Sequence, residues 1–262
     1  SSNPDNEKFI SNEVGGEYRS DKVAIKGSYY NTQWKDRNLT KSVTSGQGDS
    51  GDTDIIYLTG VNQSHSGFEI ESKVALHEMV ELDVAVSIGD WYFDGDAEGD
   101  YLKQEYNDDN QIIGQTSEEY QYALNNLMVG DMPQKSYVGG LTVKPLEGLR
   151  VQGLYRYYTD HYSDWSPSAR EIEDGVADRA QVWQAPDYGK LDFHLSYKLP
   201  EIAGLDMTLH GHVFNALDNV YVQDATDNSK YNGYGDKLHL AHNAEVFLGT
   251  PRHFNLGLSV NF

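Results

Sequence analysis

The chain has 262 residues, with 41 acidic and 20 basic side chains, a formal charge of −21 and no cysteine. The acidic balance argues against a nucleic-acid partner, because binding phosphates requires clustered Lys and Arg. The lack of cysteine excludes disulfides, thiolate metal sites and thiol catalysis, and no apolar run approaches the roughly 18 residues of a membrane-spanning helix.

Apolar and polar residues alternate with a period of two, which predicts strands along the whole chain. The pattern is clearest from Phe254 to Phe262, where every second side chain is apolar. Most of the predicted strands are close to the roughly 9 to 11 residues with which a tilted strand crosses a bilayer. Nine strands are predicted, at 13–20, 23–35, 68–76, 82–89, 136–144, 149–159, 191–199, 205–223 and 254–262.

The connections between these strands alternate in length. Short links at 20–22, 77–81, 145–148 and 200–204 alternate with long ones from 36 into the sixties and at 94–133, 160–187 and 224–250. Short turns at one end and long loops at the other are typical of an outer-membrane barrel, whereas a soluble sandwich has more evenly spaced turns. The sequence therefore predicts an all-β, transmembrane antiparallel β-barrel.

Aromatic residues lie near the ends of the predicted strands. They are Tyr29, Tyr30, Trp34, Trp91, Tyr92, Phe93, Tyr155, Tyr157, Tyr158 and Tyr162. Girdles of such rings are expected where a barrel meets the headgroup zone of a membrane. Ordinary strand propensity is the alternative explanation.

An odd number of strands conflicts with the even number of single-chain bacterial barrels. A final strand that ends at the short-turn side places the first strand's beginning with the long loops. We therefore expect residues 1–262 to be the C-terminal part of a larger barrel domain, completed by another segment of the same protein. Alone, the sheet would leave two unpaired edges in lipid, at several kcal/mol for each backbone group.

Several motifs resemble the TonB-dependent outer-membrane receptors. Residues 213–221 are similar to that family's N-L-F-D-x-x-Y segment, although Ala216 and Leu217 stand where Leu and Phe are usual. Residues 249–258 resemble G-x-P-R-x-F-x-L-G-L, and Phe262 resembles the terminal assembly signal. Residues 3–36 are similar to a pair of family strands, and 67–71 match G-x-E-x-E. The segments 89–91, 185–189 and 224–227 look like receptors of the Bacteroidota type.

The resemblance implies a location and a set of partners. In that family 22 strands surround an N-terminal plug in the outer membrane of a Gram-negative bacterium, so these strands would be the last nine. External loops capture a nutrient ligand, and TonB pulls on the plug to drive energy-coupled uptake. The implied partners are the plug and earlier barrel strands, TonB through the plug, membrane lipid and lipopolysaccharide, and in some receptors a surface lipoprotein. Nucleic acid, cofactors and enzymatic activity are not expected.

The ligand stays open among a siderophore, haem, cobalamin, a glycan and a peptide. Tyr162, Trp165, Trp183 and Tyr188 lie in or beside the loop at 160–187 and are predicted to stack on that ligand, with loop packing as the alternative. Two other function classes remain, namely an outer-membrane barrel without a plug (an adhesin, porin or enzyme) and a soluble secreted β-protein.

Two candidate metal sites are weighed against simpler interpretations. Residues 94–105 approximate an EF-hand calcium loop, with oxygen donors at the first, third, fifth, seventh and twelfth places. A solvated acidic loop is the preferred interpretation of this segment, with calcium binding as the alternative. Histidines at 194, 210 and 212 lie on polar strand faces, and those at 239 and 242 share one loop. A polar barrel lumen explains the first three without a metal, and no catalytic motif is present.

Overall fold

The computed structural model describes residues 6–44, 53–109, 111–201, 204–229, 232 and 238–261. The predicted motif at 3–5 and the terminal Phe262 lie outside the described residues. In chain order the elements are β1 (Lys8–Arg19), β2 (Val23–Thr44), β3 (Thr53–His77), β4 (Val80–Phe93), β5 (Ala97–Tyr106), β6 (Ile112–Tyr122), β7 (Pro133–Leu146), β8 (Leu149–Tyr162), α1 (Pro167–Arg170), β9 (Gln184–Ala185), β10 (Tyr188–Lys198), β11 (Asp206–Phe214), β12 (Val222–Thr226), β13 (Glu245–Leu248) and β14 (His253–Asn261). Among the described residues, no helix has the length and apolar character needed to cross a membrane.

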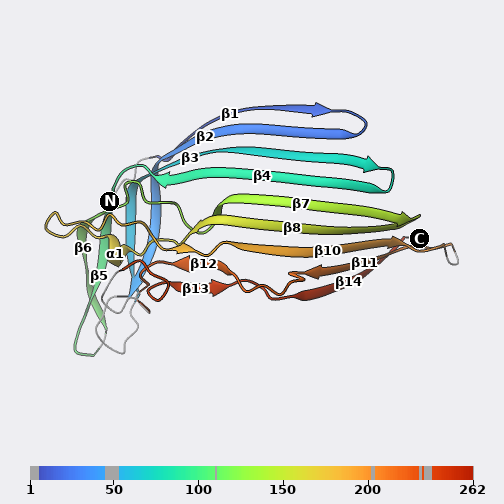
Figure 1. Cartoon of the computed structure of the whole chain (residues 1–262). Coiled ribbons are helices and arrows are strands. Elements are labelled where there is room, and N and C mark those ends of the chain that lie inside the picture. The colour runs from blue at the N-terminus through green and yellow to red at the C-terminus, as the bar shows by residue number, and fades with distance from the viewer. Residues whose placement is uncertain are drawn as a thin grey trace.

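Nine strands form one continuous antiparallel path, in the order β1-β2-β3-β4-β7-β8-β10-β11-β14. Each strand of this path lies beside the one that precedes it, as in the wall of an up-and-down barrel (Figure 1). The beginning of the chain lies at the end with the long connections, and β14 runs towards the end with the short turns (Figure 1). The nine predicted strands and their direction are confirmed.

Two predicted long loops consist largely of strands, so that expectation was wrong. The pairing of β2 with β3 continues out to Thr44 and Thr53. Within the predicted loop at 94–133, β5 and β6 form a hairpin that pairs with β3. These extensions project beyond the nine-strand sheet, where neither face must be uniformly apolar. They therefore lack the alternation by which strands are recognised in a sequence.

The predicted strand at 205–223 is too long. β11 ends at Phe214, and the chain then turns through Asn215 and Asp218, both in the left-handed region with φ of 47° and 56°. The Asn219 amide donates to Asn215 Oδ1 at 3.1 Å, and Asn215 Nδ2 donates to the Asn219 carbonyl at 2.9 Å. This side-chain turn stops the strand, and β12 pairs instead with β13 in a separate two-stranded sheet.

One face of the nine-strand sheet carries apolar side chains that no described part of the chain covers. A single register row crosses seven strands through Val74, Leu82, Leu141, Gly153, Phe193, Val213 and Phe254. Phe254 and Leu256 on β14 are 72% and 77% exposed. The exposed members of this outer face are Val14, Tyr18, Ile25, Tyr29, Phe68, Ile70, Leu76, Val84, Ile88, Tyr137, Leu141, Tyr155, Tyr157, Phe193, Phe254, Leu256, Leu258 and Val260. An apolar surface of this extent is typical of a membrane or protein contact.

The predicted aromatic girdle is present only in part. Tyr29, Tyr155 and Tyr157 are exposed on the outer face, whereas Trp91 Nε1 donates to the Tyr30 hydroxyl at 2.8 Å on the opposite face. Phe93 is 3% exposed, so its assignment to a girdle was wrong. Strand alternation sends neighbouring aromatic residues to opposite faces, and proximity to a strand end does not by itself place a ring at an interface.

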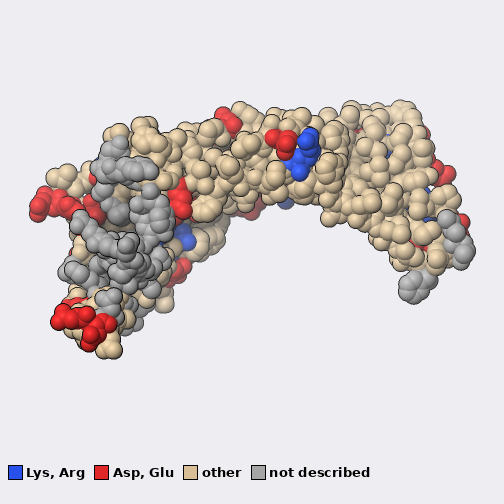
Figure 2. Space-filling view, turned by 90° about the horizontal axis from the view of Figure 1, so that it is seen from below, with Lys and Arg blue, Asp and Glu red and all other residues tan. Residues whose placement is uncertain are grey.

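The buried core lies at the long-connection end of the molecule and not behind the sheet. Its members are Ile56, Leu58, Val61, Phe93, Ala97, Tyr122, Leu124, Leu127, Trp165 and Val182. They come from the outer part of β3, from β4 to β6 and from the connections at 123–132 and 163–187. The long connections therefore pack on one another as a folded cap. Figure 2 shows the arched outline of the whole body and several acidic side chains at this end.

Candidate functional site

The face opposite the apolar one is polar and charged, and we call it the inner face. Arg156 of β8 forms an ion pair with the buried Asp192 of β10. Lys144 of β7 and Lys73 of β3 lie 2.5 Å and 3.4 Å from the carboxylate of Glu81 on β4. Strand alternation explains this arrangement, because each apolar outward residue is followed by an inward polar one.

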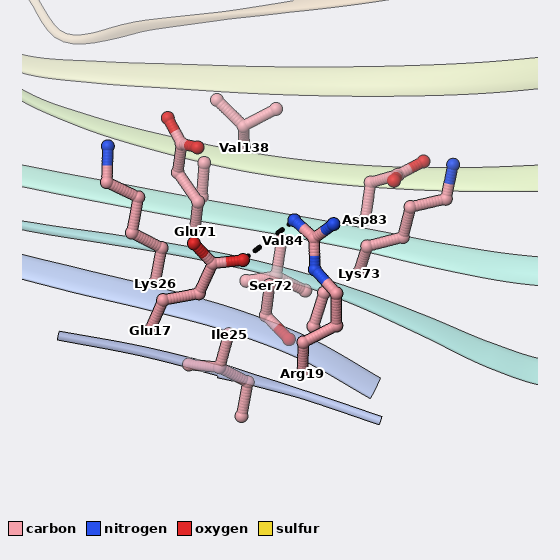
Figure 3. Close-up of a pocket in the computed structure, with 12 residues that line it drawn as sticks. Glu17, Arg19, Ile25, Lys26, Glu71, Ser72, Lys73, Asp83, Val84 and Val138 are labelled. Carbon is pink, nitrogen blue, oxygen red and sulfur yellow. Dashed lines mark ion pairs between the residues drawn. The ribbon is translucent and has the colours of Figure 1, made fainter. Parts of the chain in front are cut away.

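A groove of about 350 Å³ opens on the inner face of β1 to β4 (Figure 3). Its charged lining consists of Glu17, Arg19, Lys26, Glu71, Lys73 and Asp83, which balance one another in charge. Figure 3 shows Arg19 and Glu17 paired within β1, and their charged atoms are 2.7 Å apart. Such a surface suits a polar partner that carries charges of both signs.

Three of the four residues predicted to bind a ligand meet in the cap. Trp165 is 1% exposed, and its ring packs edge-on against Phe93 with a centroid distance of 6.3 Å. Tyr162 packs against the same buried cluster. The Ser163 hydroxyl donates a hydrogen bond to the Trp183 carbonyl at 2.9 Å, and Trp183 is half-buried. Because the Trp165 ring is enclosed, its surroundings fit the loop-packing alternative.

Tyr188, the fourth predicted residue, belongs to a different cluster on the inner face of β10. Its ring stacks on Tyr221 at 4.5 Å and lies 5.0 Å from Tyr158. Lys190 Nζ lies 5.0 Å from the centre of the Tyr221 ring and 3.5 Å from its hydroxyl. The sequence analysis missed Tyr158, Tyr221 and Lys190. Residues 188 and 190 are two apart on one strand and so share a face, which could have indicated Lys190. Tyr221 lies in a turn, where no periodic pattern predicts its position.

A buried ionic network, which we call the latch, joins the connection at 163–187 to the one at 227–245. It consists of Arg170, Asp178, Asp227 and His239. Arg170 is fully buried and donates to the Ala180 carbonyl at 2.7 Å. His239 contacts the Asp227 carboxylate at 2.5 Å and the Asp178 carboxylate at 2.8 Å. The hydrogen bond to Asp227 raises the pKa of His239 above its ordinary value. The sequence analysis did not identify this network.

The segment at 94–105, weighed as a possible calcium loop, does not have the geometry of one. Residues from Ala97 onward form β5, and at about 3.3 Å per residue a strand of this length separates its ends by roughly 30 Å. The carboxylate of Asp96 pairs with Arg179 at 2.5 Å and 2.7 Å and accepts the Leu124 amide at 3.1 Å. The hydrogen bond from Arg179 lowers the pKa of Asp96. Within the described ranges, no group of three or more His, Asp or Glu could hold a metal ion.

The histidines fall into separate environments. His194 and His212 are direct register partners on β10 and β11, and their Nδ1 atoms lie 2.9 Å apart. His210 contacts the Ser259 hydroxyl at 3.3 Å. His239 belongs to the latch. The predicted inward orientation of residues 194, 210 and 212 agrees with the strand register.

Comparison with known proteins identifies the fold. No protein-family model and no curated protein match the sequence. Among solved structures, the copper transporter OprC matches with a TM-score of 0.60 and 14% identity, covering 98% of this chain and 31% of that chain. The ferric yersiniabactin uptake receptor FyuA from Yersinia pestis matches with a TM-score of 0.56 and 18% identity, covering 97% of this chain and 29% of that chain. The ferric enterobactin receptor PfeA from Pseudomonas aeruginosa matches with a TM-score of 0.54 and 14% identity, covering 96% of this chain and 31% of that chain.

The chain spans about three tenths of the length of each of these structures. At these identities the likeness concerns the fold and not the cargo. It extends over nearly the whole chain. The chain thus has an all-β antiparallel fold that matches part of the barrel of TonB-dependent outer-membrane receptors.

Proposed function

We propose that the chain is the C-terminal wall of a 22-stranded barrel in a TonB-dependent transporter of a Gram-negative outer membrane. The observation that carries this proposal is the division of the sheet into two faces. The outer face leaves Phe254 and Leu256 largely exposed, while the inner face holds paired charges such as Arg156 and Asp192. Lipid solvates the first surface and a wet lumen the second.

The same division counts against a soluble secreted protein. Each fully exposed Leu or Phe forgoes about 1.5 to 3 kcal/mol of burial free energy, and the outer face repeats this cost across nine strands. Within the described residues, the core lies in the cap and does not cover this face. A lipid bilayer accounts for the exposed rows at once. Residues 1–262 would then need a preceding segment of the same protein to close the ring.

In this proposal the cap captures the ligand and the inner face lines the path along which it is transported. The cap would form part of the external capture surface, with Tyr162, Trp183 and Tyr188 as candidate ligand contacts and Trp165 as their packed support. A plug inside the barrel would be moved by TonB, and lipopolysaccharide, lipid and in some receptors a lipoprotein would be the other partners. The three matched structures are named for copper, ferric yersiniabactin and ferric enterobactin, so metal-containing cargoes are the first to test, and a glycan or peptide stays open.

Fractionation and uptake of the full-length protein test the proposal. Expressed in a Gram-negative host, the protein should occur in the outer membrane and migrate in gels in a heat-modifiable way. Accumulation of a labelled metal or ferric siderophore should depend on the protein and stop in a strain without TonB. Recovery from the soluble fraction would contradict the proposal, as would accumulation that does not depend on TonB.

A further inference from the structure

Two imidazoles face each other across neighbouring strands of the inner face. His194 on β10 and His212 on β11 are register partners, and their Nδ1 atoms are 2.9 Å apart. The two ring centres lie 5.1 Å apart with an interplanar angle of 62°, so the rings meet edge to face. Neither residue is buried. At this separation one ring donates a hydrogen bond to the other, and the hydrogen-bonded pair is accessible from the inner face.

A ligand would have to replace the hydrogen bond between these two imidazoles, while the neighbouring carboxylate is engaged elsewhere. The inward carboxylate of Asp192, two residues before His194, is already held by Arg156 and by the Asn215 amide at 2.8 Å. It therefore does not hold either ring. The ring of Phe214 lies 5.6 Å from that of His194 and 5.8 Å from that of His212 and forms an apolar floor beside the pair.

The register adds further donors beside the pair. One inner-face row runs through Gln152, His194, His212 and Asn255 on four neighbouring strands. It places one side-chain amide on either side of the two histidines. Amide oxygens and imidazole nitrogens together form an N,O donor set, which suits copper(II) and nickel(II).

The separation of the two nitrogens is that of a hydrogen bond, and an ion would have to replace this bond. Two imidazole nitrogens, each about 2.05 Å from a metal, are roughly 2.9 Å apart at a right angle and roughly 3.4 Å apart at a tetrahedral angle. An ion with right-angled ligands could therefore replace the hydrogen bond with little change in this separation. Right-angled ligation by nitrogen and oxygen is typical of copper(II), which also has the highest affinity in the divalent series.

We propose that His194 and His212 form an open two-imidazole site for copper(II) on the inner wall. Among the described residues the site has no third His, Asp or Glu, so water or a ligand of the cargo would complete the coordination. Two protein ligands give an exchangeable site, as transit through a lumen requires. That transit role rests on the proposed function, whereas copper binding by the pair does not.

Copper(II) titration of the purified full-length protein in detergent tests the site, with electron paramagnetic resonance as the readout. Loss of even an outer-shell partner typically costs roughly 10- to 100-fold in metal affinity. His194→Gln and His212→Gln should therefore each weaken copper(II) binding at least about tenfold and remove a nitrogen ligand from the spectrum. The control is His65→Gln, which changes an imidazole on β3 that contacts Gln63 at 3.2 Å and should leave binding unchanged.

Heat-modifiable migration of every variant separates a lost site from a lost fold. The proposal is overturned if the double variant His194→Gln/His212→Gln migrates normally and binds copper(II) as tightly as the unchanged protein. It is equally overturned if the unchanged protein shows no two-nitrogen signal at 100 µM copper(II), a concentration on the order of a weak site's Kd. Failure of nutrient uptake alone would count against the proposed function and not against this binding site.

Discussion

Gly249 has no side chain because the ring of Tyr221 occupies the place where one would lie. A Cβ built at Gly249 would be 1.9 Å from that ring. Tyr221 is in turn stacked on Tyr188 and is 8% exposed. The same relation recurs on the inner face, where a Cβ at Gly67 would be 2.5 Å from the Tyr30 hydroxyl. At both places the lack of a side chain on glycine lets an aromatic ring pack directly against the backbone.

Gly249→Ala should therefore destabilise the protein, because overpacking of a tight contact costs about 1 to 3 kcal/mol. The measurement is the denaturant midpoint of the detergent-solubilised protein, followed by tryptophan fluorescence. Gly16→Ala is the matched control, because nothing lies within 4 Å of a Cβ at Gly16. Equal midpoints for the two variants would contradict the close packing of the Tyr221 ring on Gly249 as a source of stability.

Long connections become a folded cap through pairing and ion pairs between elements. The hairpin of β5 and β6 adds to β3, and Asp96 before β5 pairs with Arg179 of the connection at 163–187. The latch then ties that connection to the next one through Arg170, Asp227 and His239. Charges buried in this way are stable only while each has its partner.

The raised pKa of His239 makes the latch sensitive to pH. Its causes are the hydrogen bonds to Asp227 and Asp178, which outweigh burial and the nearby Arg170. A pKa that is raised on folding stabilises the folded cap fully below the ordinary value of 6.5, and this contribution is lost as the pH rises through the raised value. The cap should therefore loosen as the pH increases from about 6 to above 8.

Trypsin cleavage after the exposed Arg179 reports on the latch. At pH 6, His239→Gln should be cleaved faster than the unchanged protein, and the difference should shrink as the pH rises through the raised pKa of His239. Comparison of the two proteins at each pH cancels the enzyme's own pH dependence. His77→Gln, in the turn between β3 and β4, is the control and should show no difference at any pH. A difference that stays constant with pH would disprove the titration of His239.

At the scale of the whole molecule, the sheet has two surfaces of opposite character and two outer strands with one free side. β1 and β14 end the nine-strand path, and among the described residues each pairs with a strand on one side only. In lipid such an edge is costly, because its backbone groups have no water with which to bond. The arrangement therefore requires further strands if the proposed membrane setting is correct.

Leu256→Arg distinguishes a lipid-facing row from a merely exposed one. On the lipid face of a barrel an Arg near the midplane costs about 2 to 4 kcal/mol, whereas on a soluble protein a 77% exposed position would tolerate it. Folding efficiency of the full-length protein into lipid vesicles, followed by heat-modifiable migration, measures the effect. Ser259→Arg, three residues along on the inward side of β14, should fold nearly normally. Equal folding of both variants would contradict a lipid-facing row.

The sequence alone was sufficient to predict the nine-strand sheet and its apolar face. Strands with one apolar face, such as β10 and β14, can be recognised by alternation, which depends only on local spacing. The alternation of short and long connections also predicted the direction of every strand. The same reasoning failed for β5 and β6, which are mainly polar, and for the outer part of β3, where the consecutive apolar residues 55–58 give no alternation.

The candidate sites depended far more on tertiary structure. Parity along β10 and β11 placed residues 194 and 212 on the inner face, and only the register between the two strands brought their Nδ1 atoms to 2.9 Å. The predicted residues Trp165 and Tyr188 are separated into a buried core and an inner-face stack. The alternating pattern that encodes a strand is local, whereas the packing of the cap and the pairing of His239 with Asp227 join residues distant in sequence. Such contacts leave no periodic trace, so only the folded chain decided them.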